Sequence, residues 1–127
     1  MIFHDYYSNR YLREHSDNLR NHFDINRNGI DYHNLHNTGI EFKECFSEVH
    51  KQQFFKVPLL QVNLANYFVF CIKDEKYFVV NVNKIKNRFT FENKYELAYI
   101  RINTVMNMSI YQTDDINELK FFISNLI

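Results

Sequence analysis

Two carboxylates and a lysine stand out in the segment NGIDYHNLHNTGIEFKECF, residues 28–46. Glu41 and Lys43 are two residues apart in an apolar run, so in a strand they lie on the same face. Asp31 precedes Glu41 by ten residues, and it joins them if the two segments are neighbouring strands. Two carboxylates can hold a hard cation such as Mg²⁺, which prefers oxygen ligands.

This grouping predicts hydrolysis of a phosphate ester. Asp31 and Glu41 are the expected metal ligands, and the backbone carbonyl of Phe42 could add a third protein oxygen. A bound Mg²⁺, or Mn²⁺ in its place, lowers the pKa of a coordinated water and offsets charge on a phosphate. Lys43 can orient that water and stabilise the transition state.

Two strands and a preceding helix must position these side chains. We predict strands over residues 30–33 and 39–46, joined by the polar loop NLHNT. In the first strand Ile30 and Tyr32 should face the core and Asp31 and His33 the opposite side. In the second strand Glu41 and Lys43 should likewise face away from the core. A helix is expected over residues 5–23, because Leu12, Leu19 and Phe23 fall within one narrow arc at helical spacing.

The rest of the chain is predicted to contain both helices and strands. A short helix is expected over residues 57–66, with Pro58 in its first turn. The run YFVFCI predicts a central strand buried on both faces, and YFVVNV after it predicts the second strand of a hairpin. A last helix should be capped by Thr113 or Asp114.

Composition favours one folded domain. The 127 residues are 46% hydrophobic and 17% aromatic, which is enough for a sizeable core. The element order predicts an α/β (α+β) fold, with a central mixed β-sheet flanked by helices and a single domain over residues 1–127. Cys45 and Cys71 lie in apolar runs and read as buried free cysteines of a reducing compartment.

The motif of the PD-(D/E)XK nuclease superfamily resembles the pattern of Asp31, Glu41 and Lys43, in which Glu-Phe-Lys begins ten positions after the Asp. The resemblance extends to the order of elements over residues 5–85. It implies a restriction-endonuclease-like core and a metal-dependent phosphodiesterase acting on DNA. It also suggests a catalytic role for Gln61, on the helix after the Glu-Phe-Lys strand. The chain departs from the pattern at Ile30, where proline is common, and Glu14 is not assigned the role of a first-helix glutamate.

Other polar residues have weaker interpretations. The basic segment over residues 84–101, above all Lys84, Lys86 and Arg88, could contact DNA phosphates or form a solvated strand edge. His33 and His36 do not favour a zinc site, because no further histidine or cysteine ligands accompany them. Glu44 falls on the predicted apolar face of its strand, where a carboxylate has no evident reason to be.

These observations predict a Mg²⁺-dependent DNA endonuclease of restriction or junction-resolving type. The alternative is a non-catalytic α+β module that binds nucleic acid or protein. A chain of this size has little room for a separate DNA-reading domain, so we expect a homodimer with two active sites. A net charge of zero excludes a strongly basic coat but not DNA binding. No signal peptide or membrane span is apparent, which predicts a soluble, cytoplasmic protein.

Overall fold

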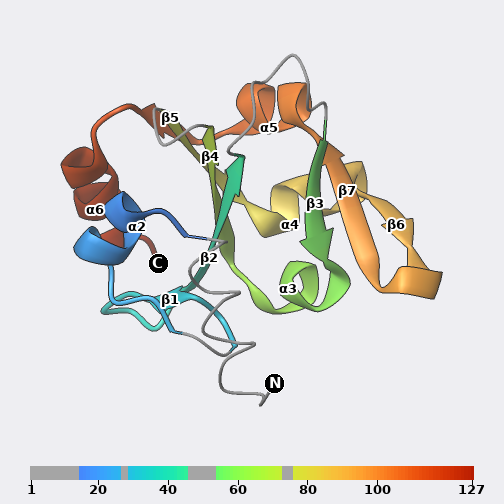
Figure 1. Cartoon of the computed structure of the whole chain (residues 1–127), viewed down its shortest axis with the longest axis horizontal. Helices are drawn as coiled ribbons and strands as arrows, with labels where there is room; N and C mark the ends of the chain where they lie inside the picture. Colours follow the sequence, from blue (N-terminus) through green and yellow to red (C-terminus); the bar gives the residue numbers. More distant parts are fainter. Residues whose placement is uncertain (1–14, 27–28, 46–53, 73–75) are drawn as a thin grey trace.

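The computed structural model has a mixed α+β fold built on two β-sheets (Figure 1). It describes residues 15–26, 29–45, 54–72 and 76–127, and in Cys45 the backbone alone. The larger sheet has five strands in the order β1-β2-β4-β5-β8, and the smaller has three in the order β3-β7-β6. The predicted fold class is therefore confirmed, although the second sheet was not foreseen.

The described strands are β1 (Tyr32–His33), β2 (Gly39–Cys45), β3 (Phe54–Pro58), β4 (Tyr67–Ile72), β5 (Lys76–Asn81), β6 (Thr90–Glu92), β7 (Leu97–Arg101) and β8 (Tyr111–Thr113). The described helices are α2 (Asp17–His22), α3 (Leu59–Leu64), α4 (Val82–Ile85), α5 (Ile102–Met108) and α6 (Ile116–Ser124), with 3₁₀ turns η2 (Lys86–Arg88) and η3 (Asn93–Tyr95). None of these helices is long and apolar enough to cross a membrane.

Strand β4 is the centre of the larger sheet, as its continuous apolar run predicted. It pairs in parallel with β2 on one side and antiparallel with β5 on the other. The β4–β5 hairpin is also as predicted. Parallel strands need a crossover connection, and the chain between β2 and β4 contains β3 and α3. That crossover places β3 in the smaller sheet, beside β7.

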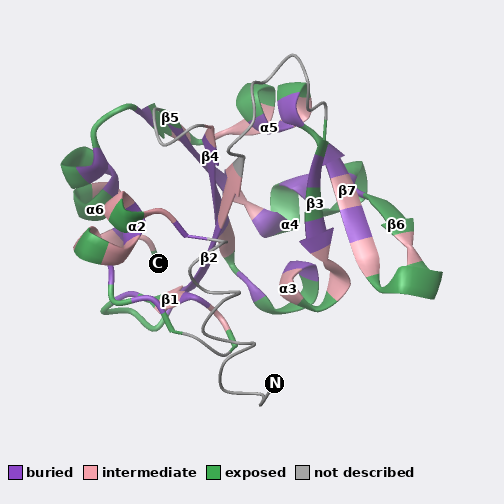
Figure 2. Cartoon of the chain, in the orientation of Figure 1, coloured by how far each residue is buried: buried purple, intermediate pink, exposed green. Residues whose placement is uncertain are grey.

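Both faces of the larger sheet are covered by a hydrophobic core (Figure 2). Helices α2 and α6 cover one face, where their buried side chains pack with those of the strands, among them Leu19, Phe42, Val69, Leu119 and Ile123. The smaller sheet covers the other face, where Phe55 of β3 and Ile100 of β7 share a core cluster with Phe68, Phe70 and Val80 of the larger sheet. Burial on both sides explains why β4 and β5 lack a polar alternation.

The predicted helix over residues 5–23 is wrong in its extent. Residues 5–14, which include Leu12 and Glu14, lie outside the described part of the chain. Ser16 is extended (φ −67°, ψ 162°), and its side chain accepts a hydrogen bond from the backbone N–H of Leu19. A serine in this position caps a helix that starts at the next residue, so α2 begins at Asp17. The predicted burial of Leu19 and Phe23 is confirmed.

Two other element boundaries differ from the predicted ones, because local backbone and capping interactions override the apolar pattern. The helix expected from residue 57 starts at Leu59, because Val57 and Pro58 end strand β3. The cap of the last helix is Asp115, whose carboxylate accepts from the N–H groups of Asn117 and Glu118. Thr113 instead ends β8. The predicted burial of Cys71 is confirmed.

Glu44 has a structural role that its sequence position concealed. Both oxygens of its carboxylate lie 3.1 Å from the backbone nitrogen of Ser16, which donates to them. The carboxylate therefore ties the start of α2 to strand β2. This contact accounts for a charged residue on the face of β2 that packs against the α2–α6 core.

Asn34 anchors the loop between β1 and β2 to the end of α6. Its side-chain amide donates to the carbonyls of Ile123 (2.9 Å) and Leu126 (2.7 Å). Its side-chain oxygen accepts from the N–H groups of His36 (2.9 Å) and Thr38 (3.0 Å). Asn34 and its bonds to Ile123 and Thr38 are buried, so removal of the side chain leaves these two backbone groups without a replacement from bulk water.

We expect Asn34→Ala to lower the free energy of unfolding by about 2–4 kcal/mol, because it leaves these buried backbone groups unsatisfied. Urea unfolding followed by circular dichroism measures the change. Asn117→Ala, at an exposed position of α6, is the matched control and should change stability by less than about 1 kcal/mol. Equal stability of the two variants would contradict an anchoring role for Asn34.

Candidate active site

Asp31 and Glu41 are held against each other by two reciprocal hydrogen bonds. The backbone N–H of Asp31 donates to Oε1 of Glu41 at 2.9 Å. The backbone N–H of Phe42 donates to Oδ2 of Asp31, also at 2.9 Å. Strand pairing creates this arrangement, since Tyr32 of β1 lies opposite Ile40 of β2. The predicted convergence of Asp31 and Glu41 is therefore present in the structure.

Glu41 is fully buried, which the sequence did not predict. Its exposed fraction is 0%, and that of Asp31 is 7%. Glu41 lies opposite Phe68 of β4 and so faces the core between the two sheets. A Glu41 carboxylate directed away from the core into solvent was the expectation, and that expectation is wrong. Among the described residues, Oε2 of Glu41 has no hydrogen-bond partner.

The expected face of the residues before β1 is also corrected. Ile30 packs against the core between the sheets, whereas Tyr32 packs against the α2–α6 core. Only Tyr32 and His33 are paired as β1, so residues 30–33 do not form one regular strand. The departure from strand geometry allows the backbone N–H of Asp31 to reach Glu41 instead of a ladder partner.

Burial and a neighbouring negative charge make Glu41 a weak acid. Loss of hydration, followed by the charge of Asp31, raises the pKa of Glu41 to about 8. The positive charge of Lys43 acts in the opposite direction and lowers it. At neutral pH without a cation, the Glu41 carboxyl is therefore largely protonated. A positive charge placed beside the pair would favour release of this proton, as Lys43 already does in part.

Lys43 and the Phe42 backbone complete the predicted constellation. Lys43 is half-buried and lies opposite Phe70, on the same face of β2 as Glu41. The N–H and C=O of one strand residue point to the same side of the strand. Because the Phe42 N–H points to Asp31, its carbonyl is directed to that side too. The three oxygen groups expected to bind metal, from Asp31, Glu41 and the Phe42 backbone, therefore lie near one another.

His15 is a member of the site that sequence reasoning missed. It is 3% exposed, and its Nε2 lies 3.6 Å from Oδ1 of Asp31. It lies sixteen positions before Asp31 in the sequence, within the region expected to be helix. No spacing rule links the two. The next residue, Ser16, is held by Glu44 of β2, and this contact fixes the chain beside Asp31.

Gln61 lies on α3, as predicted, and its side-chain Oε1 is buried without a hydrogen-bond partner among the described residues. No hydrogen bond joins it to Asp31, Glu41 or Lys43 in that part of the chain. A catalytic role for Gln61 stays a prediction. Its unsatisfied oxygen is an unusual feature for a buried side chain.

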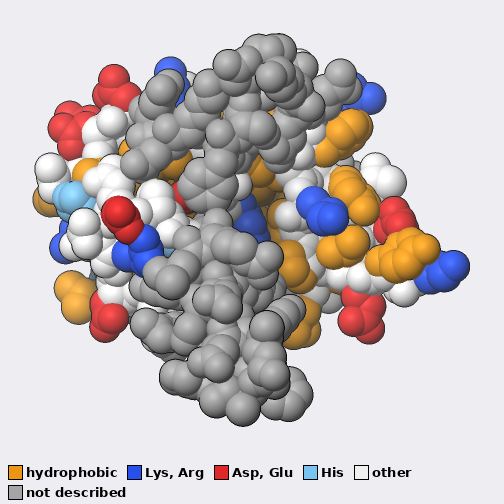
Figure 3. Space-filling model, viewed as in Figure 1, with side chains coloured by type: hydrophobic (Ala, Val, Ile, Leu, Met, Phe, Trp, Pro, Cys, Tyr) orange, Lys and Arg blue, Asp and Glu red, His pale blue; other side chains and the backbone are white. Residues whose placement is uncertain are grey.

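The predicted DNA-contacting residues are exposed and lie on other elements. Lys84 is on α4, and Lys86 and Arg88 are on η2. In the view of Figure 3, basic side chains are scattered among acidic and apolar ones and do not form one continuous patch. His33 and His36 are exposed too. No group of three or more histidine, cysteine or acidic side chains with metal-binding geometry occurs among the described residues.

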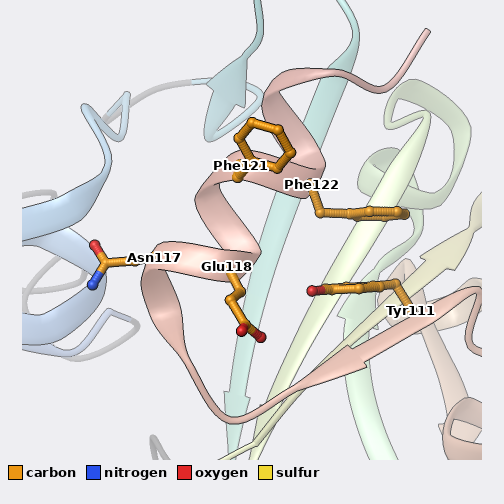
Figure 4. Close-up of a pocket in the computed structure, with 5 residues that line it drawn as sticks. All are labelled: Tyr111, Asn117, Glu118, Phe121 and Phe122. Atoms are coloured by element: carbon orange, nitrogen blue, oxygen red, sulfur yellow. The ribbon is translucent and has the colours of Figure 1, made fainter.

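A separate depression of about 590 Å³ is lined by Tyr111, Asn117, Glu118, Phe121 and Phe122 (Figure 4). The rings of Tyr111 and Phe122 stack on each other with centroids 4.1 Å apart. The Glu118 carboxylate accepts from the hydroxyl of Thr113. None of the residues that line the depression belongs to the carboxylate site.

Comparison of the chain with family models, with curated protein sequences and with solved structures found no significant match. Interpretation of the site therefore depends on its own geometry.

The raised pKa of Glu41 predicts a pH-dependent stability. Between its unfolded value of 4.5 and about 8, the folded protein holds a proton that the unfolded chain has released. Stability contributed by this proton is present below pH 4.5 and is lost as the pH rises toward 8. In EDTA, the free energy of unfolding should fall from pH 5.5 to pH 8, and it should fall less in Glu41→Gln.

Urea unfolding at the two pH values measures this difference. Glu118→Gln, which alters an exposed carboxylate outside the site, should keep the wild-type pH dependence. Identical pH dependence in wild type and Glu41→Gln would show that Glu41 does not titrate as described.

Proposed function

We propose that this protein is a metal-dependent endonuclease that hydrolyses phosphodiester bonds of DNA. The observation that carries the proposal is the buried pair of Asp31 and Glu41, held by two carboxylate–backbone hydrogen bonds, with no partner for Glu41 Oε2 in the part of the chain that the structure describes. The resemblance of Asp31, Glu41 and Lys43 to the PD-(D/E)XK motif points to the same chemistry. The parallel β2–β4 pair, joined through α3, supports a restriction-endonuclease-like core.

The donor set fits a hard divalent cation. Asp31 and Glu41 offer carboxylate oxygens, and the Phe42 carbonyl is directed to the same side of β2. All three donors are oxygens, which Mg²⁺ and Mn²⁺ accept, while zinc favours nitrogen and sulfur. Burial and the charge of Asp31 keep a proton on Glu41, and a divalent cation would replace that proton and offset the repulsion between the two carboxylates.

In the proposed reaction, a water oxygen adds to phosphorus and the bond to one sugar oxygen breaks, giving a phosphate monoester and an alcohol. A bound Mg²⁺ supplies an acidified water and neutralises charge on the phosphate. The protein's own groups do the positioning. Asp31 and Glu41 are fixed by backbone N–H groups, so they need no rearrangement. Lys43 orients the attacking water and stabilises the negative charge that develops on the phosphate oxygens.

Cleavage assays test the proposal. Wild-type protein with Mg²⁺ or Mn²⁺ should cut at least one of four substrates: plasmid, linear duplex, single-stranded and four-way-junction DNA. Asp31→Asn and Glu41→Gln should reduce the rate by at least about 10³-fold, because each removes a metal ligand. Lys43→Ala should slow cleavage more than it weakens DNA binding. Asp114→Asn, at an exposed site, should cut like wild type.

The same assay separates the alternatives. A folded protein that cuts none of these substrates would favour a non-catalytic α+β binding module. Faster cleavage of matched RNA would change the substrate class. The expected homodimer, with one site for each strand of a duplex, can be measured by sedimentation of the active protein.

Metal binding should be visible without any substrate. We expect Mg²⁺ or Mn²⁺ to raise the thermal unfolding temperature at pH 8, because a ligand of the folded state stabilises it by mass action. The increase should be smaller at pH 6, where protons compete for Glu41. Glu41→Gln and Asp31→Asn should lose the effect, and Asp114→Asn should keep it. An equal increase in all four proteins would indicate non-specific binding.

A further inference from the structure

The outward side of the smaller sheet carries aromatic and cationic side chains in an ordered array. Burial alternates along β3 and β7 (Figure 2), so every second residue faces away from the core. We define this outer face by its outward residues: Phe54, Lys56 and Pro58 of β3, Leu97, Tyr99 and Arg101 of β7, and Thr90 and Glu92 of β6. Figure 3 shows apolar side chains beside basic and acidic ones in this region.

Strand register places cations directly against aromatic rings. Arg101 lies opposite Phe54, and Tyr99 lies opposite Lys56. The Arg101 guanidinium is 5.3 Å from the centre of the Phe54 ring. Directly opposed side chains in an antiparallel pair are about 5 Å apart, so Lys56 is the cross-strand neighbour of Tyr99, whose hydroxyl is hydrogen-bonded to Glu92. Phe54 remains 39% exposed, which is unusual for a phenylalanine in a sheet.

Just beyond the strand β6, the turn η3 repeats the same combination. The Lys94 ammonium lies 5.4 Å from the ring centre of Tyr95, and Tyr95 is 59% exposed. Glu92, on the outer face, and Glu96, after the turn, are the nearby acidic residues. Lys56, Arg101 and Lys94 therefore outnumber the acidic residues in this region, giving a local positive excess in a chain whose net charge is zero.

We propose that the outer face of the smaller sheet binds single-stranded DNA. Exposed rings offer surfaces on which unpaired bases stack, and neighbouring Lys and Arg side chains contact the phosphates between them. A duplex hides its bases in the stack, so it could use the cations but not the rings. The proposal concerns binding alone and does not rest on the nuclease activity, so it can be tested in the absence of divalent cations.

The test is fluorescence anisotropy with a labelled oligo(dT) of about 20 nucleotides, in EDTA at low salt. Wild type should bind it more tightly than a blunt duplex of equal length. Tyr99→Leu combined with Phe54→Leu should weaken binding about tenfold or more, as expected for the loss of base stacking. Lys56→Ala combined with Arg101→Ala should weaken binding and reduce its salt dependence.

Matched controls lie on α6. Phe121→Leu removes a ring that is 77% exposed, and Lys120→Ala removes an exposed cation. Both should bind like wild type. A third variant, Lys84→Ala with Lys86→Ala and Arg88→Ala, removes the other exposed basic group, and it should retain the preference for oligo(dT) over duplex.

Three results would overturn the proposal: no binding of oligo(dT) by wild type, equal binding by wild type and both outer-face variants, or loss of binding only in the variant at positions 84, 86 and 88. Circular dichroism verifies that each variant is folded. If the leucine pair does not fold, the Lys56 and Arg101 pair, whose side chains are exposed, decides the outcome alone. Normal cleavage together with absent oligo(dT) binding would reject this proposal and leave the proposed nuclease intact.

Discussion

Two hydrogen bonds, each from a backbone N–H group to a side-chain carboxylate, organise the centre of this molecule. Glu41 accepts from the N–H of Asp31, and Asp31 accepts from the N–H of Phe42. Each carboxylate thus satisfies a backbone donor that regular strand pairing leaves over at the end of β1. The bonds hold two acidic groups together in a buried place, where the charge of Asp31 is poorly screened and helps to raise the pKa of Glu41. The surrounding elements can be understood as the means of holding that pair.

Each neighbouring contact restricts the pair further. The parallel alignment of β2 with β4 places Glu41 over Phe68 and Lys43 over Phe70, so the carboxylate is dry while the lysine remains half-buried. Glu44, on the opposite face, fixes Ser16 and with it the position of His15 beside Asp31. Strand β2 therefore uses alternate residues for two tasks: one face forms the site, and the other secures the segment that covers Asp31.

The sequence predicted correctly those strands and site contacts that follow from periodicity and residue spacing. The apolar runs predicted β4 and β5, and the spacing of Asp31, Glu41 and Lys43 predicted their convergence. It failed where tertiary contacts decide. Burial of Glu41 depends on the smaller sheet, whose strand β3 follows a segment without a clear pattern. The proximity of His15 to Asp31 depends on a bond between Glu44 and a backbone N–H, which no side-chain periodicity reveals. Ser16 is a favourable N-cap residue and could have indicated that α2 begins at Asp17. The prediction followed instead the helical spacing of the apolar residues.

The energetics of the pair favour a role in binding over a role in stability. A buried carboxylate is costly, because its charged form loses hydration. An apolar residue at position 41 would pack against Phe68 and Phe70 without that cost, as buried ion pairs replaced by hydrophobic residues often show. Folding alone therefore gives no reason for Glu41. The proposed divalent cation would give one, since it would offset the repulsion between the two carboxylates and coordinate Oε2, which has no hydrogen-bond partner among the described residues. The buried pair that is costly to fold is the one that the proposed cation site requires.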